Sequence, residues 1–230
     1  MSEGMRRARL LVPALLLALG TASAPAEVRE ATPDAAFVVV TTPISAPPPK
    51  VWQALLHVKD WWGDDYTFSG SAANLQFAAT AGACLCEQWE GNGAVQGRVL
   101  MVLPERLLRL DSALGPLQEY ALKGVLEFWL KYAEDGSSVL DVEYRLIGAS
   151  GSGLDVAATR IDAQLRDQSG RLKRLVETGT AEQPKSADGE VPVSDAAQQA
   201  ASRAAILEAW KRSAEQASPA RSTDQGKEKR

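Results

Sequence analysis

The segment from Ile44 to Trp62 limits the possible folds more than any other part of the chain. It reads ISAPPPKVWQALLHVKDWW, so the prolines at 47–49 end an extended run and begin a helix. Proline suits the first turn of a helix, where its missing N–H has no partner to lose. Apolar residues at 51, 52, 55, 56 and 58 then predict a one-sided helix of two to three turns, followed by the Trp61-Trp62 pair.

Extended segments precede and follow this helix. The β-branched run 37–42 predicts a first strand, and turn signals after residue 62 recur at the spacing of short strands. The predicted strands are 74–79, 84–90, 94–103, 107–111, 120–132 and 137–147. In the last one, charged residues alternate with Leu140, Val142, Tyr144 and Leu146. Because successive strand residues point to opposite faces, the pattern predicts an antiparallel meander with one buried face.

A long helix is predicted to close the domain over residues 155–177. Its apolar residues recur at helical spacing along one stripe, at 158, 161, 165, 172, 175 and 176. A helix of this length spans roughly 35 Å, which is enough to cross the concave face of such a sheet. Ser169-Gly170 interrupts the stripe. Because glycine inside a helix costs about 1 kcal/mol, we expect a kink or a loosened turn there.

Residues 1–26 are predicted to be a secretory signal peptide. Arg6, Arg7 and Arg9 precede an apolar run over 10–19, and small residues follow it. The run is about half a bilayer span, so we expect cleavage and a periplasmic or secreted protein, with an uncleaved membrane anchor as the alternative. The Arg6-Arg7 pair leaves both the general and the twin-arginine export routes open. No other segment reaches the ~18 apolar residues of a spanning helix, so no membrane span is expected after cleavage.

The two ends of the remaining chain differ from its centre. Residues 27–35 are interpreted as a linker, and residues 180–230 as a polar low-complexity tail. Within that tail, Asp195 and Gln198 could cap a helix over 195–217, either a marginal helix or a docking element for a protein partner. Removing residues 1–26 leaves 22 basic and 28 acidic residues. This negative charge argues against nucleic acid as a partner.

Candidate catalytic groups are few. The single histidine, His57, stands at the end of the first predicted helix, where a capping or solvated role is commoner than catalysis. No serine or cysteine has a matching base nearby in sequence, and one histidine with two cysteines does not assemble a zinc site. Glu127, Asp141 and Glu143 alternate with apolar residues and are expected to face solvent. The sequence therefore predicts no catalytic residue, metal or cofactor, and favours a non-catalytic protein over an enzyme.

Cys84-Leu85-Cys86 is the least usual pair of side chains. In a strand, residues two apart share one face with Cα atoms about 6.6 Å apart, at the upper edge of disulfide geometry. Three interpretations stay open: two buried small apolar residues, a disulfide made by local distortion or with another chain, and a soft-metal or redox site. Export to an oxidising compartment favours the disulfide.

The order of these elements resembles the START-like superfamily. The resemblance covers about residues 36–178 and depends on the first strand, on Val51-Trp52-x-Ala54-Leu55, on Trp61-Trp62, and on six strands with a closing helix. It is closest to the homologues of activators of heat-shock ATPases and to the polyketide cyclase and lipid-transport group. It implies an α+β helix-grip domain over residues 36–179. A seven-stranded antiparallel sheet would wrap around the long C-terminal helix, with two short helices after the first strand.

The resemblance further implies a cavity between the sheet and the closing helix. In this fold the loop after the second helix lies near the cavity mouth, and the hydroxyl of Tyr144 is expected to have its hydrogen-bond partner in the cavity. The residues expected to contact a ligand are Trp61, Trp62, Asp65, Tyr66, Leu126, Phe128, Leu140, Val142, Tyr144, Ile161 and Leu165.

Three hypotheses of function follow. The first is an exported carrier that binds a hydrophobic small molecule or lipid without catalysis. The second is a polyketide cyclase-like enzyme, in which Tyr144 and a carboxylate at the mouth move protons. The third is an envelope protein that binds a protein partner through residues 195–217.

Overall fold

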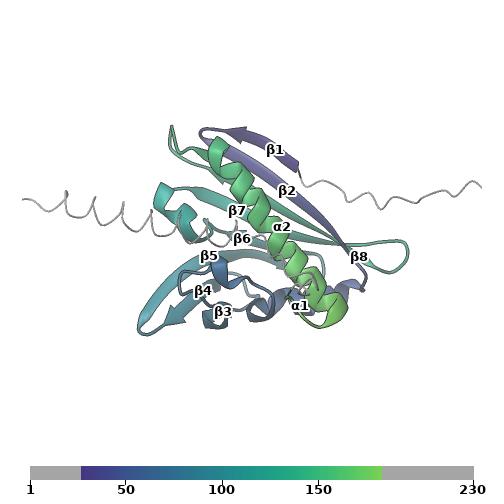
Figure 1. Ribbon diagram of the computed structural model, residues 1–230. Helices are drawn as coiled ribbons and strands as arrows, with labels where there is room; N and C mark the ends of the chain where they lie inside the picture. The colour runs from purple at the N-terminus through teal and green to yellow at the C-terminus, as the bar shows by residue number, and fades with distance from the viewer. Residues whose placement is uncertain (1–26, 183–230) are drawn as a thin grey trace, which may run out of the picture. The chain divides into compact units, whose positions relative to one another are not determined.

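The structure, a computed structural model, describes residues 27–182. The predicted signal peptide and the predicted tail helix over 195–217 lie outside the described residues. Within the described range, one antiparallel sheet, two α-helices and four short 3-10 turns form a single α+β domain. Figure 1 shows the long helix α2 (Leu154–Thr178) running across one face of the sheet.

The sheet has eight strands in the order β1-β2-β8-β7-β6-β5-β4-β3. The strands are β1 (Glu27–Thr32), β2 (Ala35–Ile44), β3 (Leu75–Phe77), β4 (Cys84–Trp89), β5 (Asn92–Leu103), β6 (Leu107–Asp111), β7 (Lys123–Tyr132) and β8 (Ser138–Ile147). Strands β3 to β8 form the predicted meander, and the N-terminal strands join it through β2 and β8 (Figure 1).

The first strand corrects the sequence interpretation. Residues 27–32 were assigned to a linker, but they form β1, which pairs with β2 from Glu27 opposite Val39 to Thr32 opposite Ala35. This adds one strand to the seven expected. Residues 28–32 are exposed, so the strand is held by backbone pairing at the sheet edge and carries no alternation that reveals it.

The concave face of the sheet carries the core. One line of register partners crosses five strands, from Val38 through Tyr144, Leu126 and Leu110 to Val99. All five side chains are at most 2% exposed. The buried face predicted from alternation in the last two strands is therefore confirmed.

Helices cover this face in two groups. The helix α2 packs mainly on β2, with β1 and β8 beside it. It is continuous through Ser169-Gly170, so the expected loosened turn is absent there, and Ser169 is buried. The second group follows β2 and consists of α1 (Pro48–Leu56), η1 (Val58–Asp60), η2 (Asp64–Tyr66) and η3 (Ala72–Asn74). A fourth turn, η4 (Gly115–Tyr120), lies between β6 and β7.

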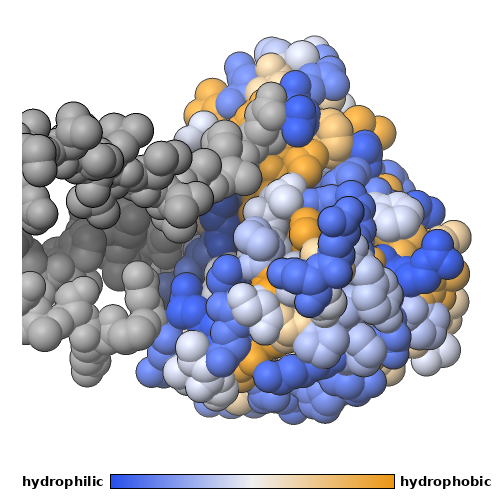
Figure 2. All heavy atoms as spheres, turned by 90° about the vertical axis from the view of Figure 1, so that its right-hand side faces the viewer, coloured by the Kyte–Doolittle hydropathy of each residue, from blue (hydrophilic) through white to orange (hydrophobic). Residues whose placement is uncertain are grey.

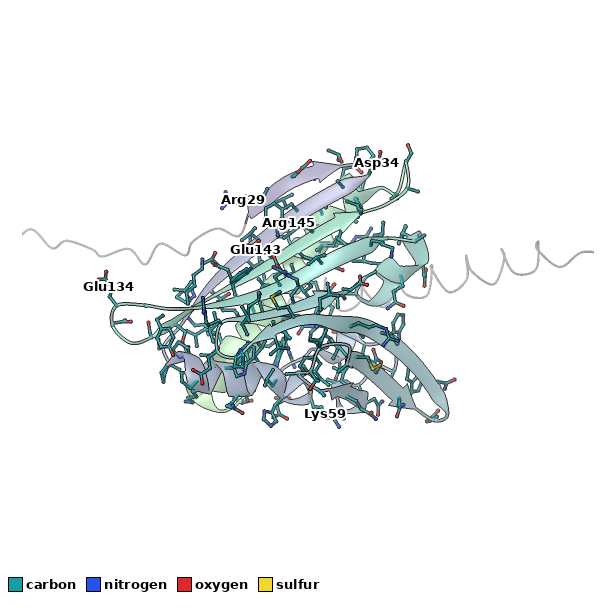
Figure 3. The ribbon with its side chains drawn as sticks, turned by 180° about the vertical axis from the view of Figure 1, so that it is seen from behind. Arg29, Asp34, Lys59, Glu134, Glu143 and Arg145 are labelled. Atoms are coloured by element: carbon teal, nitrogen blue, oxygen red, sulfur yellow. A yellow bond between two sulfur atoms is a disulfide. The ribbon has the colours of Figure 1, made fainter. Side chains whose placement is uncertain are left out.

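The opposite face of the sheet carries a ladder of charges, of which Figure 3 labels Glu143 and Arg145. Glu127 accepts hydrogen bonds from Arg109 at 2.5 Å and from Arg145 at 3.2 Å, and Arg145 also contacts Glu143 at 2.9 Å. The Arg145 guanidinium lies 3.9 Å from the centre of the Phe37 ring. Glu127 does point away from the core as expected, but its two arginines cover it and leave it 5% exposed, so it does not face solvent.

The same outer face carries the two cysteines. Cys84 and Cys86 form a disulfide within β4, as the second of the three interpretations predicted. Their Cα atoms are 5.4 Å apart, less than the spacing of a regular strand. The distortion coincides with a shift in the pairing of β4 with β5, between Leu85 and Cys86.

The surface is mixed in character. On the side shown in Figure 2, hydrophobic residues reach the surface in patches between hydrophilic ones. Within residues 27–182, neither helix is both long enough and apolar enough to cross a membrane.

Candidate ligand site beside the tryptophan pair

The Trp61-Trp62 pair lies between η1 and η2, within the second group of helices, and both side chains are buried. The two side chains are 2% and 3% exposed, and their ring centres lie 5.3 Å apart. Trp61 also meets the ring of Phe128 edge to face at 6.4 Å. The indole N–H of Trp61 donates to the Leu55 carbonyl at 3.2 Å, and that of Trp62 to the Tyr66 carbonyl at 3.3 Å. With both N–H groups bonded to backbone, the rings offer only apolar surface to the interior.

A small apolar cavity borders these rings. Its volume is about 10 Å³, and its walls are Leu55, Val58, Trp61, Trp62, Phe77, Leu85, Leu108, Leu110 and Phe128. A cavity of this size is at the lower limit for one water molecule. Any larger molecule enters only if part of the wall moves.

The predicted contact residues are placed in three ways. Trp61, Trp62 and Phe128 line the cavity. Asp65 and Tyr66 lie in η2, just after the tryptophans. The remaining six are core residues, each at most 3% exposed: Leu126, Leu140, Val142, Tyr144, Ile161 and Leu165. These six belong to the buried core, and the small cavity lies toward α1, β4 and β6.

Sequence reasoning missed six of the lining residues: Leu55, Val58, Phe77, Leu85, Leu108 and Leu110. The helical spacing that buries Leu55 and the alternation of Leu108 with Arg109 assign them to the interior. Neither pattern shows which interior residues line a cavity, because that depends on how distant segments of the chain pack against them.

Tyr144 is held by backbone groups and not by a cavity. Its hydroxyl accepts a hydrogen bond from the Leu114 N–H at 3.0 Å and donates to the Ser112 carbonyl at 3.1 Å. Burial raises the pKa of the Tyr144 hydroxyl far above its usual value. A phenol with both hydrogen bonds satisfied and a raised pKa is poorly placed to give or take a proton from a ligand.

Two side chains of α2 hold the backbone beside the tryptophans. Gln168 accepts from the Gly63 N–H at 3.0 Å through Oε1, and Arg171 donates from Nε to the Trp61 carbonyl at 2.9 Å. Gln168 is 4% exposed, and its Nε2 has no hydrogen-bond partner within the described part of the chain. A buried donor without a partner costs about 1–3 kcal/mol. Gln168 therefore holds a buried donor without a partner in the described residues, on a side chain bonded to the backbone that directly follows Trp62.

The segment after the tryptophans is held by two carboxylates. Asp64 accepts from the Ala72 N–H at 2.7 Å. Glu87, fully buried on β4, accepts from the Phe68 N–H at 3.0 Å, from the Ser69 N–H at 2.9 Å and from the Gln96 amide. Because short turns make up most of residues 58–77, these side-chain bonds replace regular secondary structure in fixing the segment.

Metal and histidine chemistry are not evident in residues 27–182. This part of the chain has no group of three or more His, Cys, Asp or Glu arranged to hold a metal ion. His57 ends α1 and its Nδ1 lies 2.7 Å from the Gln53 carbonyl, so it has the capping role expected of it.

No protein-family model and no curated protein matches the chain. Solved structures do resemble it in fold. A conserved protein of unknown function from Enterococcus faecalis is 16% identical, over 80% of this chain and 90% of its own, with a TM-score of 0.49. A protein from Mesorhizobium loti is 24% identical over 61% and 96%, with a TM-score of 0.44. Ara h 8.0201 is 13% identical over 62% and 97%, with a TM-score of 0.45.

Similarities at these identities concern the fold alone. The sheet order and the placement of the helices in the chain itself define its fold. An antiparallel sheet curves around the long C-terminal helix, and the short helices follow the strand that pairs with β8. The chain has the α+β helix-grip fold of the START-like proteins.

Proposed function

We propose that this protein binds a compact hydrophobic molecule that carries one hydrogen-bond acceptor, and that it does so without catalysis. The ligand would lie between the tryptophan pair and Gln168 and would accept the hydrogen bond of the Gln168 amide. The observation that carries the proposal is this buried Nε2 donor, which has no partner in residues 27–182 and belongs to a side chain whose Oε1 is bonded to Gly63, the residue after Trp62.

The size of the interior narrows the ligand class. Since the cavity is about 10 Å³, a long lipid chain would require the core beneath α2 to be rebuilt. A compact molecule requires only that residues 63–77 move outward. That segment consists of two 3-10 turns and a three-residue strand, and its movement requires that the side-chain bonds from Asp64, Glu87 and Gln168 open.

Two features support a carrier over an enzyme. Tyr144, the expected proton donor, is engaged by Ser112 and Leu114. The described residues near the tryptophans offer no paired nucleophile and base. Export belongs to the same proposal, and the Cys84–Cys86 disulfide supports it, since disulfides persist in oxidising compartments.

Contact quenching of tryptophan fluorescence tests the location of the site. The probe is para-bromoacetophenone, a compact aromatic ketone whose bromine quenches only rings it touches. We expect saturable quenching in the full chain, strongly reduced by Trp62→Phe and retained in Trp129→Phe, because Trp129 lies on the outer face of β7. Quenching that does not saturate, or that is lost equally in both variants, would contradict the proposed site.

A further inference from the structure

The Cys84–Cys86 disulfide contributes little as a structural link. It joins residues two apart in one strand, so it ties no distant parts of the chain together. The entropic effect of a disulfide on the unfolded chain is smallest for the shortest loops. Strand β4 is already paired with β3 on one side and with β5 on the other. The fold therefore has no evident need of this bond.

The pairing shift beside the disulfide is also fixed by other contacts. The residue of β5 that has no partner on β4 is Gln96. Its amide donates to Glu87, its Oε1 accepts from the Gly115 N–H at 2.8 Å, and its carbonyl accepts from the Ser112 hydroxyl at 2.6 Å. This buried network holds the irregular register whether or not the two sulfurs are joined.

The sulfurs lie where a reagent can reach them. Leu85, between the cysteines, points into the core and is 1% exposed, so Cys84 and Cys86 point to the outer face. Both cysteines are half-buried and not enclosed. Cys86 lies opposite Gln76 of β3 and Val95 of β5, and Cys84 lies opposite Arg98 of β5. Val95 and Arg98 are both exposed.

One positive charge faces the pair. Arg98 lies directly opposite Cys84, at a distance where cross-strand side chains interact. Within residues 27–182 Arg98 has no ion-pair partner, and the nearest acid in register is Asp111 on its other side. A cation beside a cysteine favours the thiolate, and a stable thiolate is a good leaving group.

The disulfide also adjoins an open cleft. The cleft has a volume of about 210 Å³ and is lined by Val95, Gln96, Gly97, Arg98, Asp111, Ser112, Ala113 and Gln118. Two of these residues, Val95 and Arg98, are the register partners of Cys86 and Cys84. The cleft is therefore lined by the two residues of β5 that face the cysteines across the strand pair.

The geometry points to a thiol–disulfide exchange site at Cys84–Cys86, whose reductant is a dithiol. A thiolate of the dithiol attacks Sγ of Cys86, the S–S bond breaks, and its electron pair leaves on Sγ of Cys84, opposite Arg98. In the mixed disulfide, the first sulfur of the dithiol is bonded to Sγ of Cys86. The second thiolate of the dithiol then attacks that first sulfur and releases Cys86 as a thiolate. The two cysteines gain two electrons and the two protons that the dithiol lost, and the dithiol becomes a disulfide.

Reduction of the folded, full-length protein tests this inference. Dithiothreitol is added at graded ratios of reduced to oxidised reagent, thiols are trapped with a maleimide and counted by mass, and near-ultraviolet circular dichroism reports the fold. We expect reversible reduction with the fold retained, and a Cys84→Ser/Cys86→Ser protein that melts close to the wild type. A disulfide that is reduced only as the protein unfolds would overturn the inference.

The role of Arg98 has its own measurement. After reduction, alkylation of the thiols by iodoacetamide at neutral pH should be about fivefold slower in Arg98→Gln, the effect of one solvent-screened charge at contact distance. Arg160→Gln removes the same charge from the exposed side of α2 and should match the wild type. With single cysteines, Cys86→Ser should be alkylated faster than Cys84→Ser. Equal rates in Arg98→Gln and the wild type would contradict the assigned leaving group.

The source of the dithiol is distinguished by two further reagents. Reduced glutathione, a monothiol, is compared with a peptide that carries two cysteines separated by two residues. Faster reduction by the peptide at equal thiol concentration supports a protein dithiol as the reductant, and equal or faster reduction by glutathione would contradict the assignment of a dithiol. Failure of both, with dithiothreitol also inactive, rejects the site. None of these readouts depends on ligand binding at the tryptophans.

Discussion

The Oε1 atom of Gln168 accepts a hydrogen bond from the Gly63 N–H at 3.0 Å, and so joins the middle of α2 to the residue that follows the two tryptophans. The contact connects positions 105 residues apart. It uses one half of a buried amide and leaves the Nε2 half without a partner in residues 27–182. Gln168 is thus both a clamp on the loop and the polar group that a ligand would meet.

Replacement of Gln168 by Met should loosen the loop more than it weakens the fold. The variant loses the bond to Gly63 but also removes an unpaired buried donor, so the free energy of unfolding should change by less than about 1 kcal/mol. Amide hydrogen exchange at Gly63 should become faster. Gln164→Met, one turn earlier on α2, makes neither change and is the control. Unaltered exchange at Gly63 would show that Gln168 does not hold the loop.

Replacement of Glu87 by Gln should destabilise the domain by about 2 kcal/mol, because an amide cannot accept from three donors as a carboxylate does. The groups affected are the N–H groups of Phe68 and Ser69 and the amide of Gln96. Urea unfolding measures the loss. Glu90→Gln, in the exposed turn after β4, should stay within about 0.5 kcal/mol of the wild type, and an equal loss in both variants would refute the role of Glu87.

Tyr144 should make the domain sensitive to alkali. Burial raises the pKa of its hydroxyl above the ordinary value of 10.0, so the unfolded chain releases this proton before the folded protein does. Stability from this group is complete below pH 10.0 and falls as the pH rises further. Phenolate absorbance should show one tyrosine that ionises only as the protein unfolds, and Tyr144→Phe should abolish that step. Ionisation of all four tyrosines in the folded protein would be inconsistent with this burial.

Gly124 should tolerate no side chain. A Cβ atom there would lie 2.7 Å from Leu146 Cδ2 and 2.8 Å from Tyr144 Cε2, and closer still to the Ser112 carbonyl oxygen. Gly124→Ala should therefore cost about 3 kcal/mol through overpacking, measured by thermal or urea unfolding. Gly93→Ala, whose Cβ would meet only the Glu87 carbonyl at 3.5 Å, is the matched strand control and should be nearly neutral.

Periodicity predicted the parts of the fold that are amphipathic. Each of β7, β8 and α2 buries one face, which produces the alternation in the strands and the apolar stripe of the helix. A single sequence is therefore enough to predict them. The strand β1 is not, because its side chains are exposed and only its backbone pairs. The continuity of α2 at Ser169-Gly170 likewise depends on tertiary packing, which outweighs the local cost of glycine.

The candidate site was predictable only in part. The tryptophans and Phe128 were expected from the family resemblance and from their aromatic rings, but Gln168 was not, because a glutamine on a helix carries no signal of burial. Its partner, Gly63, is 105 residues away. Tyr144 needed a hydrogen-bond partner, and the sequence could not show that a loop would supply it.

The central claim is tested most directly by calorimetric titration of the full chain with two probes that differ in one acceptor, para-bromoacetophenone and para-bromoethylbenzene. The account predicts that the wild type binds the ketone about tenfold more tightly, the effect of one buried hydrogen bond, and that Gln168→Met abolishes the difference while Gln164→Met preserves it. Equal affinities of the wild type for both probes, or a preference that survives in Gln168→Met, would contradict it.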